Sequence, residues 1–268
     1  INHEMDHGET DEGAVPDFVI DQMTELMDIL QAELKRPNPV PQHADATPCP
    51  VRALLFDAGD VLYYRAERGR FFTEFLEELG INPEQDHAAE TFSLRQQAYC
   101  GQIEQEEFQE AVLHQLGITQ PDQVLRGLEA LEKDEKNVRF FVGVAETLIA
   151  LKETGFLLGI VTDTANPLHA KLSWFERGGF GHVWDSFTSS KDVGIRKPDS
   201  KIYCAALEQL GVSADQAVFV GHKASELGGA TDLGIKTIAF NYDEDSRADY
   251  FVENFADILK VPIISWER

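Results

Sequence analysis

Apolar runs spaced along the chain predict the strands of one sheet. The run at residues 51–56 is apolar except for one arginine and has the length of a buried strand. Similar runs predict further strands at residues 156–161, 183–190, 217–220 and 236–240, and a final short strand and helix within residues 248–260. Helical patterns lie between several of them, at residues 144–155, 167–180 and 200–211. Strands and helices that alternate in this way favour an α/β fold with a parallel sheet.

One long region between the first two strands is helical throughout. Apolar side chains recur there at helical spacing in segments separated by turns that contain Gly, Pro or Asn, at residues 71–80, 88–101, 105–117 and 123–134. We therefore expect a helical domain at residues 63–137, inserted into a core made of residues 51–62 and 138–268.

Residues 1–50 differ from the rest of the chain. Residues 1–15 are polar and acidic, and residues 17–36 carry apolar side chains at helical spacing. Five prolines between positions 37 and 50 then predict an extended linker. An isolated amphipathic helix cannot bury its apolar face alone. We expect this N-terminal helix either to pack on its own core or to form a homodimer or bind a partner.

Composition narrows the classes of partner. The chain has 47 acidic and 23 basic residues and a formal charge of −24, which opposes binding to nucleic acid and to anionic membranes. No apolar run approaches the roughly 20 residues of a membrane helix, and the polar N-terminus does not resemble a signal peptide. Cys49, Cys100 and Cys204 are far apart and lack metal-ligand spacing, which favours reduced thiols and a cytoplasmic protein.

Polar side chains follow several of the predicted strands. Asp57 ends the first apolar run, Thr162 ends the second, and His222 follows the run at residues 217–220. Lys197 lies in the basic turn GIRKPD between the last two. Because ligands of α/β sheets bind beyond the carboxyl ends of the strands, these four residues are expected to converge at one edge of the sheet.

The order of these residues resembles the haloacid dehalogenase superfamily, most of whose members are phosphatases. The family pattern is a strand-end nucleophilic Asp, a strand-end Thr or Ser, a Lys before Pro and a strand-end acidic motif. Asp57, Thr162 and Lys197 match it, and the later segment GGATDLGIKTIAF is also similar. The resemblance implies a Rossmann-like three-layer core with strand order 3-2-1-4-5, and a helical cap formed by residues 63–137.

The resemblance also implies roles for the matching residues. Asp57 would attack phosphorus and form an aspartyl-phosphate, and Lys197 would neutralise phosphoryl charge. The hydroxyl of Thr162 would donate to a phosphoryl oxygen, helped by the backbone N–H groups of Asp163 and Thr164 at a helix start. Thr162 and Asp163 could equally cap that helix.

Two positions depart from the family pattern. Gly59 replaces the second Asp, which normally acts as acid and base, and His222 replaces the acidic residue of the fourth motif. Asp60 could substitute for the missing Asp only if the chain turns sharply at Ala58 and Gly59.

These departures weaken the implied metal site. Asp57, the carbonyl of Gly59, His222 and Glu226 could hold Mg²⁺, and Mn²⁺ would tolerate the imidazole better. Alternatively, a protonated His222, with Lys223 nearby, would take the place of the cation.

Three functional hypotheses remain open from the sequence. The leading one is a phosphatase acting on a small phosphorylated metabolite. The second is a member of the fold that has lost catalysis and acts as a binding or scaffold protein through its N-terminal helix. The third is a metal-independent 2-haloacid dehalogenase-like hydrolase, which would also use an Asp nucleophile without the second Asp.

Overall fold

The computed structural model describes residues 50–82 and 88–264. The predicted amphipathic helix at residues 17–36, the proline-rich linker and Cys49 lie outside this part of the chain. Cys100 and Cys204, which lie inside it, are free thiols, as the spacing of the cysteines predicts.

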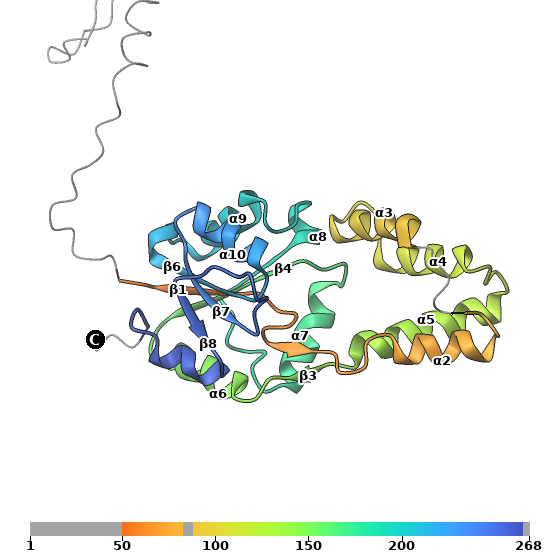
Figure 1. Ribbon diagram of the computed structural model, residues 1–268, viewed down its shortest axis with the longest axis horizontal. Helices are drawn as coiled ribbons and strands as arrows, with labels where there is room; N and C mark the ends of the chain where they lie inside the picture. The colour runs from red at the N-terminus through yellow and green to blue at the C-terminus, as the bar shows by residue number, and fades with distance from the viewer. Residues whose placement is uncertain (1–49, 83–87, 265–268) are drawn as a thin grey trace, which may run out of the picture. The chain divides into compact units, whose positions relative to one another are not determined.

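Within the described residues, six parallel strands form one sheet in the order β5-β4-β1-β6-β7-β8 (Figure 1). The strands are β1 (Ala53–Phe56), β4 (Leu157–Thr162), β5 (Ser186–Ser189), β6 (Ala217–Gly221), β7 (Lys236–Phe240) and β8 (Tyr250–Val252). This confirms the predicted order 3-2-1-4-5, with the short final strand added beyond the fifth. β1 is central, because it pairs with β4 on one side and with β6 on the other.

β1 is apolar because the sheet is covered on both faces. Leu54 and Phe56 belong to one buried hydrophobic cluster, and Ala53 and Leu55 belong to another. Successive side chains of a strand point to opposite faces, so a central strand between two helical layers needs apolar residues at every position.

Helices from both halves of the core supply these two layers. The first cluster includes side chains of α6 (Val144–Glu153), α7 (Leu168–Arg177) and the 3₁₀ helix η2 (Phe255–Lys260). The second includes side chains of α9 (Ser200–Leu210) and α10 (Ala224–Asp232). The helix predicted at the end of residues 248–260 is therefore a 3₁₀ helix.

The region between β1 and β4 folds into helices with a small core of their own. These are α2 (Arg70–Glu78), α3 (Ala88–Tyr99), α4 (Gln105–Gln115) and α5 (Pro121–Lys136). Phe75, Leu113 and Ala130 are among the buried residues that join α2, α4 and α5. Gly127 allows close packing here, because a Cβ at this position would lie 2.5 Å from a methyl group of Leu113.

Two short strands connect these helices to the core. β2 (Tyr63–Tyr64) and β3 (Arg139–Phe140) pair antiparallel at the two ends of the insertion. Neither was predicted, because two residues are too few to show a period-2 pattern.

Hydrogen bonds also hold the insertion to the core at a second point. Ser190, the first residue of α8 (Ser190–Val193), donates its hydroxyl to the carbonyl of Tyr99 at 2.6 Å. Lys191 forms an ion pair of 2.7 Å with Glu104. Gly101 lies at φ 66 beside the carbonyl of Lys191, where a side chain would collide with the backbone. The insertion is thus tied to the edge of the sheet that carries β5.

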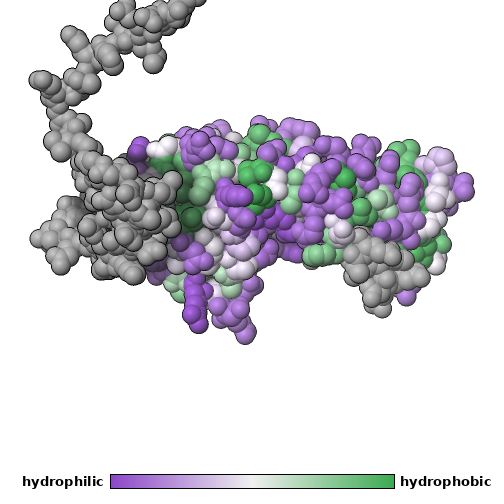
Figure 2. All heavy atoms as spheres, turned by 90° about the horizontal axis from the view of Figure 1, so that it is seen from above, coloured by the Kyte–Doolittle hydropathy of each residue, from purple (hydrophilic) through white to green (hydrophobic). Residues whose placement is uncertain are grey.

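The surface of the described residues is largely polar. In Figure 2 hydrophilic residues cover most of the visible face, and hydrophobic residues form separate patches between them. The described helices include none with both the length and the apolar composition needed to cross a membrane.

Candidate active site

A cavity of about 400 Å³ lies at the carboxyl edge of the sheet. Asp57, Thr162, Lys197, His222 and Glu226 all line it, so the convergence expected from the strand ends is present. Residues of the helical insertion complete the wall, and they include Arg95, Tyr99, Gln105, Phe108 and Glu135. The cavity is therefore enclosed by the core on one side and by the insertion on the other.

Asp57 is the central carboxylate of this cavity. It directly follows β1, its N–H donates to the carbonyl of Val220 at 2.9 Å, and its side chain is 7% exposed. Oδ1 accepts the N–H of Ala58 at 2.8 Å and lies 2.6 Å from Nζ of Lys197. Oδ2 lies 3.2 Å from Nδ1 of His222. Burial alone would raise the pKa of Asp57, but Lys197 and His222 outweigh burial and hold the pKa well below its ordinary value. Asp57 is therefore ionised.

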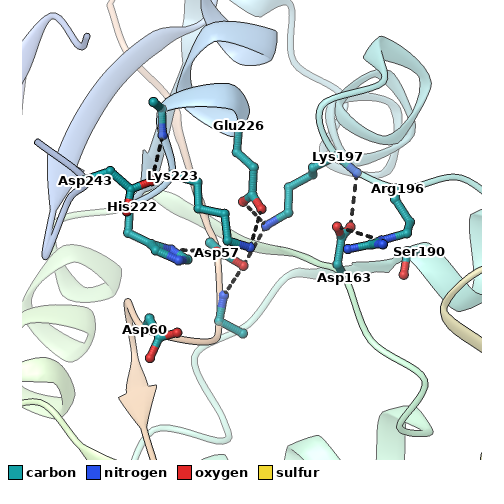
Figure 3. Close-up of polar contacts among 12 residues, drawn as sticks. Asp57, Asp60, Asp163, Ser190, Arg196, Lys197, His222, Lys223, Glu226 and Asp243 are labelled. Carbon is teal, nitrogen blue, oxygen red and sulfur yellow. Dashed lines mark hydrogen bonds and ion pairs between the residues drawn. The ribbon is translucent and has the colours of Figure 1, made fainter. Parts of the chain in front are cut away.

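Lys197 is shared between two buried carboxylates (Figure 3). Its Nζ lies 2.7 Å from Oε2 of Glu226, in addition to its contact with Asp57. Burial would lower the pKa of Lys197, but the negative charges of Asp57, Glu226 and Asp163 raise it above its ordinary value. The turn that carries Lys197 therefore places a positive charge beside Asp57.

Asp163 holds that turn. Its Oδ1 accepts the backbone N–H of Lys197 at 3.1 Å, and its Oδ2 lies 3.2 Å from Nε of Arg196. Burial raises the pKa of Asp163. The side chain of Asp163 lines the cavity, yet both of its oxygens are already engaged by the turn.

The loop between β6 and α10 supplies the remaining charged groups. Glu226 is buried in the first turn of α10, and its Oε1 lies 3.0 Å from Nζ of Lys223. The carbonyl of His222 accepts the N–H of Asp243 at 3.1 Å, which fixes the start of this loop. Two side chains of this short loop, His222 and Lys223, and one of the first turn of α10, Glu226, thus reach the cavity.

Thr162 and Thr164 differ in what they can offer a ligand. Thr162 ends β4, and its Oγ1 accepts a hydrogen bond from Nζ of Lys171 at 3.2 Å. Thr164 donates its N–H to Oγ of Ser190 at 3.0 Å, and its own hydroxyl oxygen accepts the N–H of Asn166 at 3.0 Å. The backbone N–H of Thr164 is therefore committed to the protein, which differs from its expected help in binding phosphate. α7 begins only at Leu168, so Thr162 does not cap it.

Lys171 and Tyr63 also line the cavity, and neither was predicted as a site residue. Lys171 is buried in α7, and Tyr63 begins β2. Lys171, Trp174 and Phe175 share one face of α7 at i, i+3 and i+4, so a lysine on an apolar helical face was the available signal. Trp174 and Phe175 themselves are buried in the hydrophobic core.

Arg196 is partly buried between the core and the insertion, whereas Lys223 is exposed at the edge of the cavity. Arg196 bonds Asp163 in the core and Gln96 of α3, and its guanidinium lies 4.8 Å from the ring centre of Tyr99. Arg196 therefore links the Lys197 turn to the insertion, while Lys223 lines the cavity.

The chain turns sharply after Asp57, as substitution by Asp60 would require. Asp60 has φ 61, and its N–H donates to the carbonyl of Tyr63 at 2.7 Å. Its carboxylate lines the cavity and is held by Nη2 of Arg68 at 2.5 Å and 2.8 Å. Asp60 therefore faces the same space as Asp57. Arg65 and Arg68 line the cavity too, whereas Arg70 pairs with Glu67, just before α2, and with Glu74 on α2.

The predicted metal ligands do not fit Mg²⁺ in this arrangement. Mg²⁺ prefers oxygen ligands in octahedral geometry, but the oxygens of Asp57 and Glu226 already face Lys197, Lys223 and His222. Gly59 adds no side chain. The described residues contain no group of three or more His, Cys, Asp or Glu side chains able to hold a metal ion. The ammonium of Lys197 occupies the place between the two carboxylates that a cation would need.

The protein is a Rossmann-like α/β protein with a cap. It has a parallel sheet, a helical insertion after the first strand and a cavity between the two. A sequence profile of the haloacid dehalogenase-like hydrolases matches residues 67–240. The chain therefore belongs to this family.

Named relatives within the family include phosphatases and dehalogenases. The chain is 32% identical over 138 residues to glyceraldehyde 3-phosphate phosphatase of Methanothermobacter thermautotrophicus. This match covers 48% of this chain and 59% of that protein. It is 35% identical over 107 residues to (S)-2-haloacid dehalogenase 4A of Burkholderia cepacia, which covers 40% of this chain and 45% of that protein. The chain thus spans about half the length of the curated relatives it matches.

Solved structures agree on the fold. The crystal structure of a 2-haloacid dehalogenase from Pseudomonas syringae pv. Tomato has a TM-score of 0.60 and 20% identity, and the match covers 80% of this chain and 98% of that chain. At this level of identity the likeness shows the fold alone.

Proposed function

We propose that this protein hydrolyses a small phosphate monoester through an aspartyl-phosphate on Asp57. The observation that carries the proposal is the buried, ionised carboxylate of Asp57, held at one oxygen by Lys197 in a cavity of about 400 Å³. Family membership and the phosphatases among the similar proteins support it. The cavity has room for a metabolite of a few carbon atoms plus a phosphoryl group.

The two oxygens of Asp57 have different tasks in this proposal. Oδ1 is engaged by the N–H of Ala58 and by Lys197, whereas Oδ2 has only Nδ1 of His222 beside it at 3.2 Å, so Oδ2 is the attacking atom. Oδ2 forms a bond to phosphorus while the bond from phosphorus to the leaving oxygen breaks. Lys197 stabilises the negative charge that spreads over the phosphoryl oxygens. No step of this proposed reaction requires a metal ion.

Asp60 is our candidate for the proton transfers. As an acid, it would give a proton to the leaving oxygen in the first step. As a base, it would then take a proton from the water that attacks phosphorus, releasing phosphate and restoring Asp57. The turn at φ 61 and the place of Asp60 in the cavity wall support this role, since Gly59 has no side chain.

Asp163 is proposed to position Lys197 rather than to contact the substrate. Both of its oxygens are used by the turn, as described above. Thr162 is proposed to donate its hydroxyl to a phosphoryl oxygen, because it lines the cavity at the end of β4.

An aryl phosphate assay with purified protein tests the proposal. The wild-type protein is expected to release phosphate, and Asp57→Asn is expected to reduce the rate by a factor on the order of 10³ or more, because an amide is not a nucleophile. Asp122→Asn removes the same charge from an exposed position on α5 and serves as the matched control. If Asp57→Asn retains activity within tenfold of wild type while remaining folded, Asp57 is not the nucleophile.

Metal-free dehalogenation of a 2-haloacid is a second candidate, favoured by the cationic groups that surround Asp57 and Glu226. Asp57 would attack the carbon that bears the halogen, and the carbon–halogen bond would break to release halide. Water would then hydrolyse the resulting ester to a 2-hydroxy acid, releasing a proton.

Halide release from 2-chloropropionate separates this candidate from the first. Release of chloride without release of phosphate from an aryl phosphate would establish the dehalogenase. Absence of both reactions would favour the remaining alternative, a member of the fold that binds a ligand or partner without catalysis.

A further inference from the structure

Lys171 is a buried cation that the proposed chemistry leaves without a role. The residue is 3% exposed, and it lines the same cavity as Asp57 and Lys197. Its Nζ donates to the hydroxyl oxygen of Tyr63 at 2.9 Å and to Oγ1 of Thr162 at 3.2 Å. No carboxylate oxygen of the described residues forms an ion pair with it, in contrast to Lys197, which contacts two.

A buried ammonium without a counterion is costly. Two neutral hydroxyls satisfy hydrogen bonds but bring no negative charge. The rings of Tyr63 and Trp174, with centres 5.4 and 5.9 Å from Nζ, add only modest cation–π attraction. The guanidinium of Arg65 lies 5.6 Å from the same Tyr63 ring, which adds a second positive charge nearby. This part of the cavity is therefore suited to an anion that enters from outside.

The hydrogen bonds of Lys171 leave three donors free to bind such an anion. An ammonium has three N–H donors and no acceptor, so Tyr63 and Thr162 can only accept from Lys171. Their own hydroxyl protons must then point elsewhere, and both residues line the cavity. One N–H of Lys171 is left over from these two bonds. The cavity thus holds an N–H of Lys171 and the two hydroxyls as neighbouring donors.

We propose that Lys171, Thr162 and Tyr63 form an oxyanion subsite that binds the phosphoryl group of the substrate. The subsite rests on the phosphatase function proposed above and adds to it a source of positive charge, since the carboxylates nearby do not fit a metal ion. Asp57 and Lys197 line the same cavity, so a phosphoryl group bound by these donors would lie within the space that the nucleophile faces.

Binding of inorganic phosphate, measured by calorimetric titration, tests the subsite without requiring turnover. We expect Lys171→Met to weaken phosphate binding about 10- to 100-fold, the loss typical of one charge-assisted hydrogen bond. The kcat/KM for an aryl phosphate should fall by a similar factor. Lys201→Met removes the same charge from an exposed position on α9 and should leave both quantities unchanged.

A second variant, Tyr63→Phe, allows the test to be made even if Lys171→Met does not fold. Tyr63→Phe removes one hydroxyl and keeps the ring that packs on Trp174 and Phe175. It should weaken phosphate binding several-fold while the near-ultraviolet circular dichroism stays that of the wild type. If Lys171→Met unfolds, this variant decides the question. Unchanged phosphate affinity in a folded Lys171→Met, or in Tyr63→Phe when Lys171→Met unfolds, overturns the subsite.

The outcomes also separate the subsite from the phosphatase proposal. Phosphate bound through Lys171 by a protein that hydrolyses no phosphate ester would support the subsite and contradict the phosphatase. If the wild type hydrolyses a phosphate ester but Lys171→Met binds phosphate as tightly as the wild type, the phosphatase proposal is supported and the subsite is contradicted. A wild-type protein that binds no phosphate at millimolar concentration would overturn the subsite directly.

Discussion

At the scale of single residues, Lys197 sets the charge state of the site. It lies 2.6 Å from Asp57 and 2.7 Å from Glu226 in a buried environment, where charges interact strongly. A carboxylate that acts as a nucleophile must be ionised, and Lys197 favours the ionised form of Asp57 despite its burial. The same ion pair couples folding to pH.

We expect the acid stability of the protein to depend on Asp57. Its pKa in the folded state lies below the ordinary value of 3.8, so the unfolded chain binds the proton more readily. The resulting stabilisation is fully present above about pH 4 and is lost as the pH falls toward the pKa of the folded state. Below pH 4 the free energy of unfolding of the wild type should fall by up to about 1.4 kcal/mol more per pH unit than that of Asp57→Asn. The variant has no carboxylate at this position that could bind a proton.

Urea denaturation of both proteins between pH 2.5 and pH 6 measures this difference. Stability curves that stay parallel over the whole range would mean that the pKa of Asp57 is not lowered by folding.

The departures at Gly59 and His222 give a second prediction at this scale. A Cβ at Gly59 would meet nothing closer than the hydroxyl of Tyr63 at 3.9 Å, so an Asp can be placed there. Gly59→Asp combined with His222→Asp should add the oxygen ligands that Mg²⁺ prefers. We expect this double variant to bind Mg²⁺ in calorimetric titration and to gain Mg²⁺-dependent hydrolysis of an aryl phosphate.

The double variant Gly59→Asn with His222→Asn is the control for Mg²⁺ binding. Its side chains have the same shape as the two aspartates, but amides lack the negative charge that a divalent ion requires. The wild-type activity should persist in the presence of a chelator. Loss of wild-type activity on chelation and its recovery with Mg²⁺ would show that the native site does hold the metal.

At the scale of elements, α10 packs directly on the turn that carries Lys197. A Cβ at Gly229 would lie 2.6 Å from the carbonyl oxygen and 2.8 Å from Cβ of Pro198, the residue after Lys197. A Cβ at the neighbouring Gly228 would meet nothing within 4 Å. The two glycines of α10 therefore form a matched pair, one needed for close packing and one not.

We expect Gly229→Ala to destabilise the protein by about 1–3 kcal/mol, the usual cost of overpacking. It should also lower the hydrolysis rate, since the Lys197 turn must shift to admit the methyl group. Gly228→Ala should raise stability by about 0.5–1 kcal/mol through helix propensity and leave the rate unchanged. Urea denaturation and the aryl phosphate assay measure both effects, and equal behaviour of the two variants would contradict this packing.

At the scale of the whole molecule, the chain divides into two units, Ile1–Pro48 and Cys49–Arg268. The hydrophobic clusters of the described residues are formed within the second unit. We expect deletion of residues 1–48 to leave a folded protein whose stability lies within about 1 kcal/mol of the full chain, as for a change outside the core. Hydrolysis should be retained as well.

Sedimentation of the full and truncated chains checks the predicted role of the N-terminal segment at the same time. A change from dimer to monomer would assign dimerisation to residues 1–48. Aggregation of the truncated chain, or a large loss of stability, would show instead that these residues belong to the core.

Local patterns along the chain were enough to predict the framework of this protein. The apolar runs and the helices between them predicted the sheet, and right-handed connections brought Asp57 and Thr162 to one edge. These features are local, or follow from chain connectivity, so a single sequence carries them. The same applies to the helical insertion, whose periodicity spans whole helices. The pair β2 and β3 was missed because its strands are too short to have a pattern.

Which groups share the cavity, and what each one contacts, became known from the packing of the elements. Lys171 and Tyr63 are 108 positions apart, and Arg196 and Gln96 are 100 positions apart. Such pairings depend on how elements pack and on which side-chain conformations the packing leaves open, and no spacing rule encodes them. The sequence marked Lys197 as a site residue. The fold placed its ammonium between Asp57 and Glu226, and so decided that the carboxylates predicted to hold a metal face nitrogen groups instead.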